Sequence, residues 1–238
     1  MIDKWAHLRK DLFRSVELSV KIVAVTQMCG EYCNICTPES LPGFTARVSH
    51  ESKGTIEDDI ILNRKLIKWG HTTPLQFLQF VFDVRGITKS LQNQWVRHKI
   101  GVGWIFRSTR FVPADQNNFV YSTYDYLDDE VKVRELLLID EETAKIAIQR
   151  YEEKRALGAT KEDSRKIMPL FFETPCYFEV NARALRHFFS LRLKKDAEWE
   201  IRRLADLILE KCMDIAPSLF EDFLKNHKRG GGKRKLII

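Results

Sequence analysis

Two short stretches of this sequence combine positive charge with hydrogen-bonding side chains close to one helical segment. The first holds Gln94, Arg97 and His98, followed at once by Lys99, and residues three and four apart share one face of a helix. The second, 107–110, places two arginines on either side of Ser-Thr. Arginine offers planar, bidentate donors, so this set suits a phosphate or another anion. Solvated surface clusters look the same, and that alternative stays open from these residues alone.

A further cluster begins at Asn181, where polar groups recur at helical offsets among apolar residues. Asn181 is a good N-terminal cap for the helix that follows, and Arg183, His187 and Arg192 lie along that helix. Polar groups on an apolar helix need partners, so they indicate either a binding site or internal ion pairs. In the second interpretation, Arg192 pairs with Asp196 four residues later and His187 is a satisfied, partly buried histidine.

Alternating and helical patterns predict the elements that position these clusters. We expect strands at 16–26, 75–84 and 176–180 and a loop at 101–118. We expect helices at 54–70, 87–98, 128–157, 161–168 and 182–193, and a last helix that Asp196 caps and that continues to 213. No internal repeat is evident. The sequence therefore predicts an α+β fold, a single domain with a mixed or antiparallel sheet and a helical second half.

The bulk composition is that of an ordinary folded protein, with 238 residues that are 44% hydrophobic and 30% charged. No stretch approaches the roughly 20 apolar residues that span a bilayer, and no secretion signal is evident, so we expect a cytoplasmic protein without a membrane segment. The net charge of +6 is too mild to indicate nucleic-acid binding. We predict an N-terminal extension at 1–15, the folded domain at 16–227 and a flexible basic tail at 228–238.

Three of the five cysteines, Cys29, Cys33 and Cys36, form a C-x3-C-x2-C pattern. This spacing resembles the site for a 4Fe–4S cluster in radical enzymes that use S-adenosylmethionine, although the strand–helix series that follows in those enzymes is not evident here. Three thiolates could also hold zinc or iron with a fourth ligand such as His50. We predict free loop thiols and no metal site, with metal binding at these cysteines as the alternative.

Several separated segments stand out along the chain. They are ARVSH at 46–50, Trp69-Gly70-His71, Thr73-Pro74, QWVRH at 94–98 with Ser108 and Arg110 beyond it, Arg165 before Met168-Pro169-Leu170, and NARALRHFFSLRLKKDAEWEIRRLA at 181–205. These segments occur in the same order as in flavin-dependent thymidylate synthases, and the chain resembles that family from about residue 16 to residue 223. The last segment is long and specific, so it carries most of the resemblance.

The resemblance implies roles for the clustered residues. Those implied to contact FAD are His71, Thr73, Arg97, His98, Lys99, Asn181, Arg183 and His187. Those implied to hold a pyrimidine deoxynucleotide monophosphate are Gln94, Ser108, Thr109, Arg110, Arg165 and Arg192. In the family such residues come from different subunits of a homotetramer whose active sites lie at subunit interfaces, so we expect the same assembly.

The resemblance also implies the reaction, which is the reductive methylation of dUMP to dTMP. The implied carbon donor is methylenetetrahydrofolate, and NADPH is the implied reductant of FAD. No cysteine lies in a motif that would attack the uracil ring, and the resemblance implies that the ring is activated electrostatically instead. Arg192 is the residue expected to stabilise the anion that develops at N3 and O2, and Ser108 is expected to position the substrate rather than attack it.

The sequence departs from the family signature, which is Arg-His-Arg, seven residues, then Ser. Lys99 replaces the second Arg, and eight residues separate it from Ser108. A glutamate usual within 104–106 is missing, Gln76 stands where Glu is common, and His187 stands where Asn is frequent. Lysine is a point donor whereas arginine is a fork. The alternatives are therefore an enzyme that methylates or hydroxymethylates another pyrimidine nucleotide such as dCMP, or a non-catalytic nucleotide-binding homologue.

Overall fold

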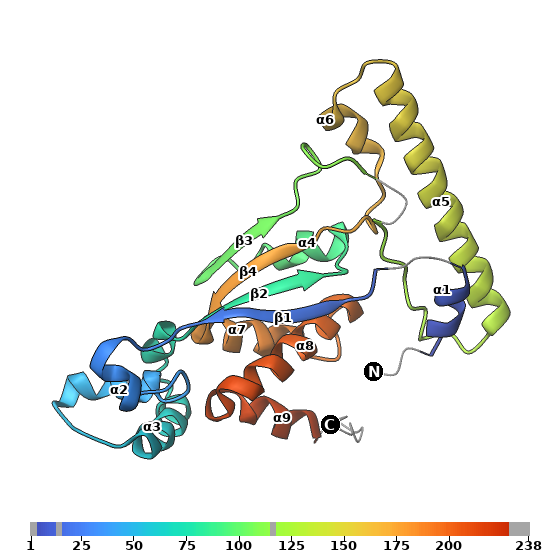
Figure 1. Ribbon diagram of the computed structural model, residues 1–238. Coiled ribbons are helices and arrows are strands. Elements are labelled where there is room, and N and C mark those ends of the chain that lie inside the picture. The colour runs from blue at the N-terminus through green and yellow to red at the C-terminus, as the bar shows by residue number, and fades with distance from the viewer. Residues whose placement is uncertain (1–3, 13–15, 115–117, 229–238) are drawn as a thin grey trace. The chain divides into compact units, whose positions relative to one another are not determined.

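A computed structural model describes residues 4–12, 16–114 and 118–228 (Figure 1). The chain divides into two compact units, and each is described by itself. Unit 1 consists of Met1–Ser19, Val84–Arg97 and Ile105–Cys176. Unit 2 consists of Val20–Asp83, His98–Trp104 and Tyr177–Ile238. The predicted division into extension, domain and tail stays a prediction, and most of the tail, 229–238, lies outside the described residues.

A four-stranded sheet in the order β1-β2-β4-β3 lies mostly in unit 2. Its strands are β1 (Ser19–Val25), β2 (Gln79–Arg85), β3 (Val102–Phe106) and β4 (Cys176–Asn181). Neighbouring strands are antiparallel, as the bonds from Thr26 N to Gln79 O (3.0 Å) and from Asn181 N to Gly101 O (3.1 Å) illustrate. The predicted α+β class with an antiparallel sheet is therefore confirmed.

Strand β3 corrects the sequence prediction, which assigned 101–118 to a loop. Its sequence, VGWIF, is rich in β-branched and aromatic residues that favour strands. Gly101 before the strand and Gly103 within it obscured this preference, and the pairing with β4 is a long-range contact that local patterns do not report. The consequence for the site is that the turn after α4 leads directly into a sheet edge.

Helices α7 (Ala182–Arg192) and α8 (Trp199–Ile215) lie along one face of the sheet in unit 2 (Figure 1). Aromatic side chains fill the space between them. Phe82 stacks on Phe178 with ring centroids 6.3 Å apart, and Phe220 meets both Phe80 (6.3 Å) and Phe189 (5.8 Å) edge to face. The chain then ends in η5 (Pro217–Leu219) and α9 (Glu221–Lys228). This aromatic core fixes α7 against the sheet.

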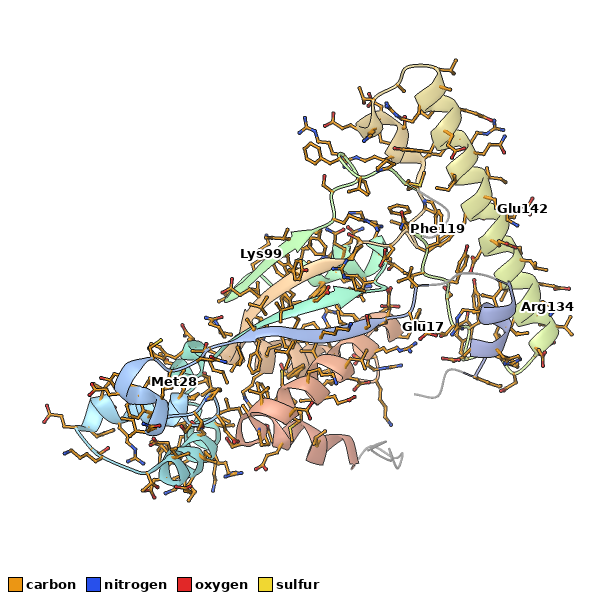
Figure 2. The ribbon with its side chains drawn as sticks, viewed as in Figure 1. Glu17, Met28, Lys99, Phe119, Arg134 and Glu142 are labelled. Carbon is orange, nitrogen blue, oxygen red and sulfur yellow. The ribbon has the colours of Figure 1, made fainter. Side chains whose placement is uncertain are left out.

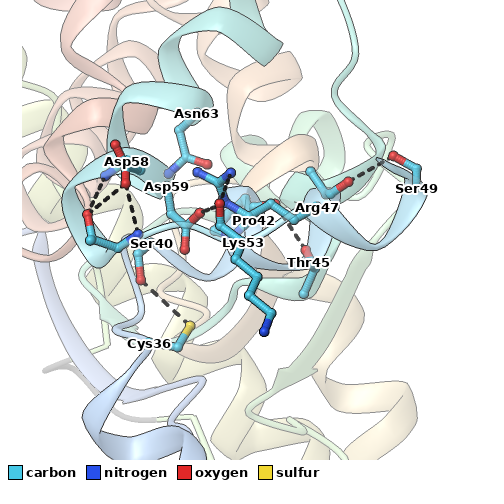
Figure 3. Close-up of polar contacts among 12 residues, drawn as sticks. Cys36, Ser40, Pro42, Thr45, Arg47, Ser49, Lys53, Asp58, Asp59 and Asn63 are labelled. Carbon is cyan, nitrogen blue, oxygen red and sulfur yellow. Dashed lines mark hydrogen bonds and ion pairs between the residues drawn. The ribbon is translucent and has the colours of Figure 1, made fainter. Parts of the chain in front are cut away.

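The N-terminal part of unit 2 contains a buried ion pair. Its elements are η1 (Gly30–Asn34), α2 (Leu41–Ala46), η2 (Arg47–His50), α3 (Ile56–Trp69) and η3 (Thr73–Phe77). Arg47 pairs with Asp59, whose side chain is 0% exposed, and also donates to Lys53 O at 3.0 Å (Figure 3). Thr55 and Asp58 form a capping box at the start of α3. The predicted helix at 54–70 is thereby confirmed, ending at Gly70 with φ of 78°.

Unit 1 is built around the long helix α5 (Glu130–Ala156). Its other helices are α1 (Ala6–Leu12), α4 (Lys89–Trp95), α6 (Lys161–Ser164) and η4 (Arg165–Ile167). Trp5 and Leu8 are buried in a core with Phe119, Val133 and Leu137, so the N-terminal residues pack against α5 (Figure 2). In the described part of the chain, no helix is both long enough and apolar enough to cross a bilayer.

Candidate functional site

Arg192 and His98 meet in unit 2. Arg192 is the last residue of α7. As the sequence predicted, Asn181 caps the start of this helix, and its side chain accepts a hydrogen bond from Ala184 N at 2.8 Å. The Arg192 Nε donates to His98 Nε2 at 3.0 Å. Within the residues that the structure describes, Arg192 has no carboxylate partner, and the alternative pairing with Asp196 is not formed. The cation is therefore oriented but not neutralised.

The environment of His98 favours the neutral imidazole. Its ring meets Phe188 edge to face at a centroid distance of 5.2 Å and lies 6.1 Å from the ring of His187. Burial is the largest of the causes that lower the pKa of His98 to about 4, and the positive charge of Arg192 and the proximity of His187 lower it further. His98 is therefore uncharged at neutral pH and is able to accept the hydrogen bond from Arg192.

A glycine holds the turn that carries His98. Gly101 has φ of +69°, a conformation that other residues adopt rarely, and a Cβ there would collide with Asn181 Nδ2. Asn181 N also donates to Gly101 O at 3.1 Å. Asn181 thus caps α7 through its side chain and bonds to the turn between His98 and β3 through its backbone, so both partners of the Arg192 contact are connected to one residue.

The remaining predicted flavin contacts of unit 2 lie at the surface. His71, Thr73, Lys99, Arg183 and His187 are exposed, whereas Asn181 is buried. Segment η3, which starts at Thr73, packs against α7. Lys99 and Arg183 have no ion-pair partner among the described residues. Exposed cations without carboxylates fit the pyrophosphate of FAD, and the roles of these residues stay predictions.

Most of the predicted substrate contacts, Gln94, Ser108, Thr109, Arg110 and Arg165, belong to unit 1, whereas Arg192 belongs to unit 2. Arg165 Nη1 donates to Thr109 Oγ1 at 3.0 Å, which brings η4 against the segment after β3. Ser108 Oγ accepts from Arg110 N at 3.3 Å, and the Arg110 side chain pairs with Glu162. Hydroxyls and guanidinium groups therefore lie together within unit 1, and their role toward a phosphate stays a prediction.

Lys89 joins this cluster and was missed by the sequence analysis. Burial lowers the pKa of the Lys89 ammonium, and the positive charges of Arg165 and Arg107 lower it further. Its Nζ donates to Gln92 Oε1 at 2.6 Å, whereas Arg107 is neutralised by the buried Glu173 at 3.2 Å. Lys89 lies 76 residues before Arg165 in the chain, so only the folded structure reveals their proximity.

Helix α4 ends earlier than the sequence predicted. It stops at Trp95, so Arg97 and His98 follow the helix instead of sharing a face with Gln94. Gln94 is half-buried and Arg97 is exposed. The boundary between the two units falls between Arg97 and His98. The predicted flavin and nucleotide residues are thus divided between the units, and their mutual placement stays a prediction.

The three clustered cysteines differ in their exposure to solvent. Cys29 and Cys33 are exposed and Cys36 is buried. In the ranges that the structure describes, no group of three or more metal-ligating side chains forms. Cys29 and Cys36 instead line an open hollow of about 310 Å³ together with aromatic and apolar side chains that include Met28 (Figure 2). Burial is the main reason that the pKa of the Cys36 thiol is raised.

The fold places this chain in the α+β class, and the charge of Arg192, which no carboxylate among the described residues neutralises, suits an anionic ligand. A family model described as thymidylate synthase complementing protein matches residues 32–218. The chain is 32% identical over 169 residues to a flavin-dependent thymidylate synthase of Clostridium tetani, covering 66% of this chain and 67% of the relative.

Two further relatives cover more of the chain. A flavin-dependent thymidylate synthase of Geobacter sulfurreducens is 31% identical over 196 residues, which are 78% of this chain and 82% of the relative. One of Thermosipho melanesiensis is 32% identical over 206 residues, 81% of this chain and 89% of the relative. The chain therefore belongs to the flavin-dependent thymidylate synthase family, a family of transferases, and the predicted resemblance is confirmed.

Proposed function

We propose that this protein converts dUMP to dTMP by reductive methylation, with FAD as bound cofactor, methylenetetrahydrofolate as carbon donor and NADPH as reductant. The observation that carries this proposal is the contact between Arg192 and the neutral His98. Through this contact, His98 holds the positive charge of Arg192 in place without neutralising it, in a chain of the thymidylate synthase family. Such a charge is what an anionic pyrimidine ring requires.

Arg192 has the chemistry to activate the uracil ring without a covalent nucleophile. Carbon C5 becomes nucleophilic when negative charge develops in the ring, and a preorganised cation stabilises that charge because it needs no reorganisation during the reaction. With Nε engaged by His98, the two terminal nitrogens of Arg192 remain available for N3 and O2 of the ring. Arg192 is thus the proposed catalytic residue.

The cluster in unit 1 is the proposed site for the 5′-phosphate. Ser108, Thr109 and Arg165 offer hydroxyl and guanidinium donors within one hydrogen-bonded group, with Arg110 beside them. Lys89 adds a half-buried positive charge that the described residues leave without a carboxylate. Gln94 completes the proposed nucleotide set. A doubly negative phosphate would relieve the mutual repulsion of these cations, which favours its binding.

The flavin is proposed to contact His71, Thr73, Arg97, His98, Lys99, Asn181, Arg183 and His187. The cations Arg97, Lys99 and Arg183 are exposed and suit the pyrophosphate, and Thr73 offers a hydroxyl. When bound and reduced, FAD supplies the hydride that completes the methyl group. The chain's own residues supply binding, orientation and charge.

Assembly and location belong to the same proposal. We propose a homotetramer with active sites at subunit interfaces, as membership of the flavin-dependent thymidylate synthase family implies. We also propose a cytoplasmic protein, since all five cysteines are free. Light scattering at working concentration tests the tetramer directly, and a stable monomer with full activity would contradict it.

The proposed function is tested by an anaerobic reaction of the full chain with FAD, NADPH, methylenetetrahydrofolate and an equimolar mixture of dUMP and dCMP. Mass spectrometry of the nucleotides is expected to show a methyl gain on dUMP alone. A modified dCMP or a hydroxymethyl product would assign the chain to another pyrimidine instead. Bound flavin with no nucleotide product at all would overturn the enzymatic proposal and favour a nucleotide-binding role.

A further inference from the structure

The contact between Arg192 and His98 fixes the protonation of one ring nitrogen. A guanidinium is always charged and carries only donors, so Arg192 Nε is the donor in the 3.0 Å bond to His98 Nε2. Nε2 must therefore carry a lone pair, and the ring proton of the neutral imidazole belongs on Nδ1. His98 consequently acts on Arg192 as an acceptor in a single tautomer.

The surroundings hold the His98 ring in place. Phe188, which is 2% exposed, meets its edge at 5.2 Å, and His187 lies on the same helix at 6.1 Å. The backbone of the following turn is fixed by Gly101 against Asn181. The charged and titratable groups that face the ring are Arg192 and His187, both from α7. Nothing among them would stabilise an imidazolium.

We propose that His98 is a positioning residue for Arg192: its unprotonated Nε2 holds the guanidinium in the orientation that directs both terminal nitrogens at the pyrimidine ring. This inference rests on the proposed function of Arg192. It assigns His98 an action on the nucleotide side of the reaction, in addition to any contact that the ring makes with the flavin.

A neutral acceptor suits this role better than a carboxylate. An aspartate or glutamate at the same place would hold Arg192 as firmly, but it would also cancel the charge that the developing anion needs. An imidazolium would lose the acceptor and place a second cation next to the first. Of these three groups, only the neutral imidazole orients the guanidinium and leaves its charge intact. His98 therefore accepts the hydrogen bond from Arg192 at pH values above its pKa, which lies at about 4.

Two substitutions separate the acceptor from the shape of the ring. His98→Leu removes the acceptor, whereas His98→Gln retains a side-chain oxygen that accepts from Arg192. The loss of a hydrogen bond to a charged group corresponds to about a 10- to 100-fold change, so we expect kcat for dUMP to fall by that factor in His98→Leu. The kcat of His98→Gln should be at least about ten-fold higher than that of His98→Leu. His7→Gln, on α1, serves as a matched control.

Flavin occupancy, measured by absorbance, and KM for dUMP decide between positioning and binding. We expect both to stay within about three-fold of the unsubstituted enzyme in His98→Gln, because the proposed effect lies in the orientation of Arg192 and not in affinity. If His98→Gln is as slow as His98→Leu while flavin and nucleotide bind normally, the acceptor is irrelevant to turnover and the inference is wrong.

A second measurement needs no turnover. The imidazole nitrogens of His98 are followed by NMR in the full chain while the pH is lowered, in the presence and absence of Arg192→Gln. We expect Nε2 to be unprotonated at neutral pH, and we expect the pKa of His98, which lies near 4, to rise in the variant because a neighbouring positive charge is removed. A proton on Nε2 at neutral pH would overturn the inference even if dTMP is formed. The expected tautomer in a chain that forms no dTMP would overturn the proposed function but preserve the contact.

Discussion

The arginines that are paired with carboxylates and the arginine of the candidate site differ in the groups that hold them. In unit 2, Arg47 is paired with the fully buried carboxylate of Asp59, and Arg186 forms two hydrogen bonds to Asp222 at 2.8 and 2.7 Å. Arg192, in the same unit, is held by a neutral imidazole. A carboxylate cancels charge while it orients, whereas an imidazole orients alone. The identity of the partner therefore separates arginines that support the fold from one that is available to a ligand.

The largest effect is expected where the carboxylate-paired arginine is removed. Arg47→Leu leaves Asp59 as an uncompensated buried charge, which costs about 3–5 kcal/mol of unfolding free energy. Urea denaturation followed by circular dichroism measures this loss. The double substitution Arg47→Leu with Asp59→Leu should be less destabilised than the single one, and equal losses would contradict the argument.

Removing the arginine that is held by histidine should instead affect turnover. Arg192→Ala is expected to lower kcat by about 10²–10³-fold, because a preorganised donor to the developing charge is lost. FAD binding, read from flavin absorbance, should change little, and so should the midpoint of urea denaturation. Arg202→Ala, in α8, is the matched control, since its guanidinium donates to Lys195 O at the protein surface. Turnover in Arg192→Ala at the rate of the control would refute the catalytic assignment.

The cations of unit 1 should act on affinity more than on rate. Lys89→Met is expected to raise KM for dUMP about 10- to 100-fold with a small change in kcat, because a charged contact to the phosphate is lost. The pKa of Lys89 is lowered from 10.5, so in the unsubstituted enzyme KM should start to rise at a pH below that value as the ammonium loses its proton. Steady-state kinetics across alkaline pH test this, and an identical pH profile in Lys89→Met would exclude the residue from the phosphate site.

The smallest effect is expected where an arginine is released from its carboxylate partner. Arg110 and Glu162 form an exposed pair, so Glu162→Gln should change the unfolding free energy by less than about 1 kcal/mol. The freed guanidinium should bind the phosphate better, which lowers KM for dUMP by a few-fold at most. Calorimetric titration with dUMP at low and high salt measures the change. A weaker affinity in Glu162→Gln would mean that the pair itself positions Arg110.

Local patterns in the sequence predicted much of the fold for physical reasons. The helix after Asn181 was predicted because a capping side chain precedes a run of apolar residues at helical spacing, and β2 was predicted from the alternation that buries Phe80 and Phe82. Strand β3 was missed because its pairing with β4 is remote in sequence. Lys89 was missed for the same reason, since its neighbours Arg107 and Arg165 are remote in sequence.

The site shows the same limit. The sequence identified Arg192 and His98 as members of a set but assigned His98 only a contact with flavin. Its role as an acceptor for Arg192 depends on a contact across 94 residues of chain and on burial that lowers the pKa of His98. Composition and spacing report neither quantity. The divided placement of the nucleotide and flavin residues also follows from the fold and not from their order along the chain.

The positions of both Arg192 and His98 depend on the absence of a side chain at Gly101. A methyl group at that position would displace the amide of Asn181, and the same amide caps α7, which ends in Arg192. The turn that carries His98 would move at the same time. Adding one carbon atom at residue 101 would therefore disturb both Arg192 and His98, although residue 101 contacts neither side chain. The disturbance would be transmitted to Arg192 through the cap of α7.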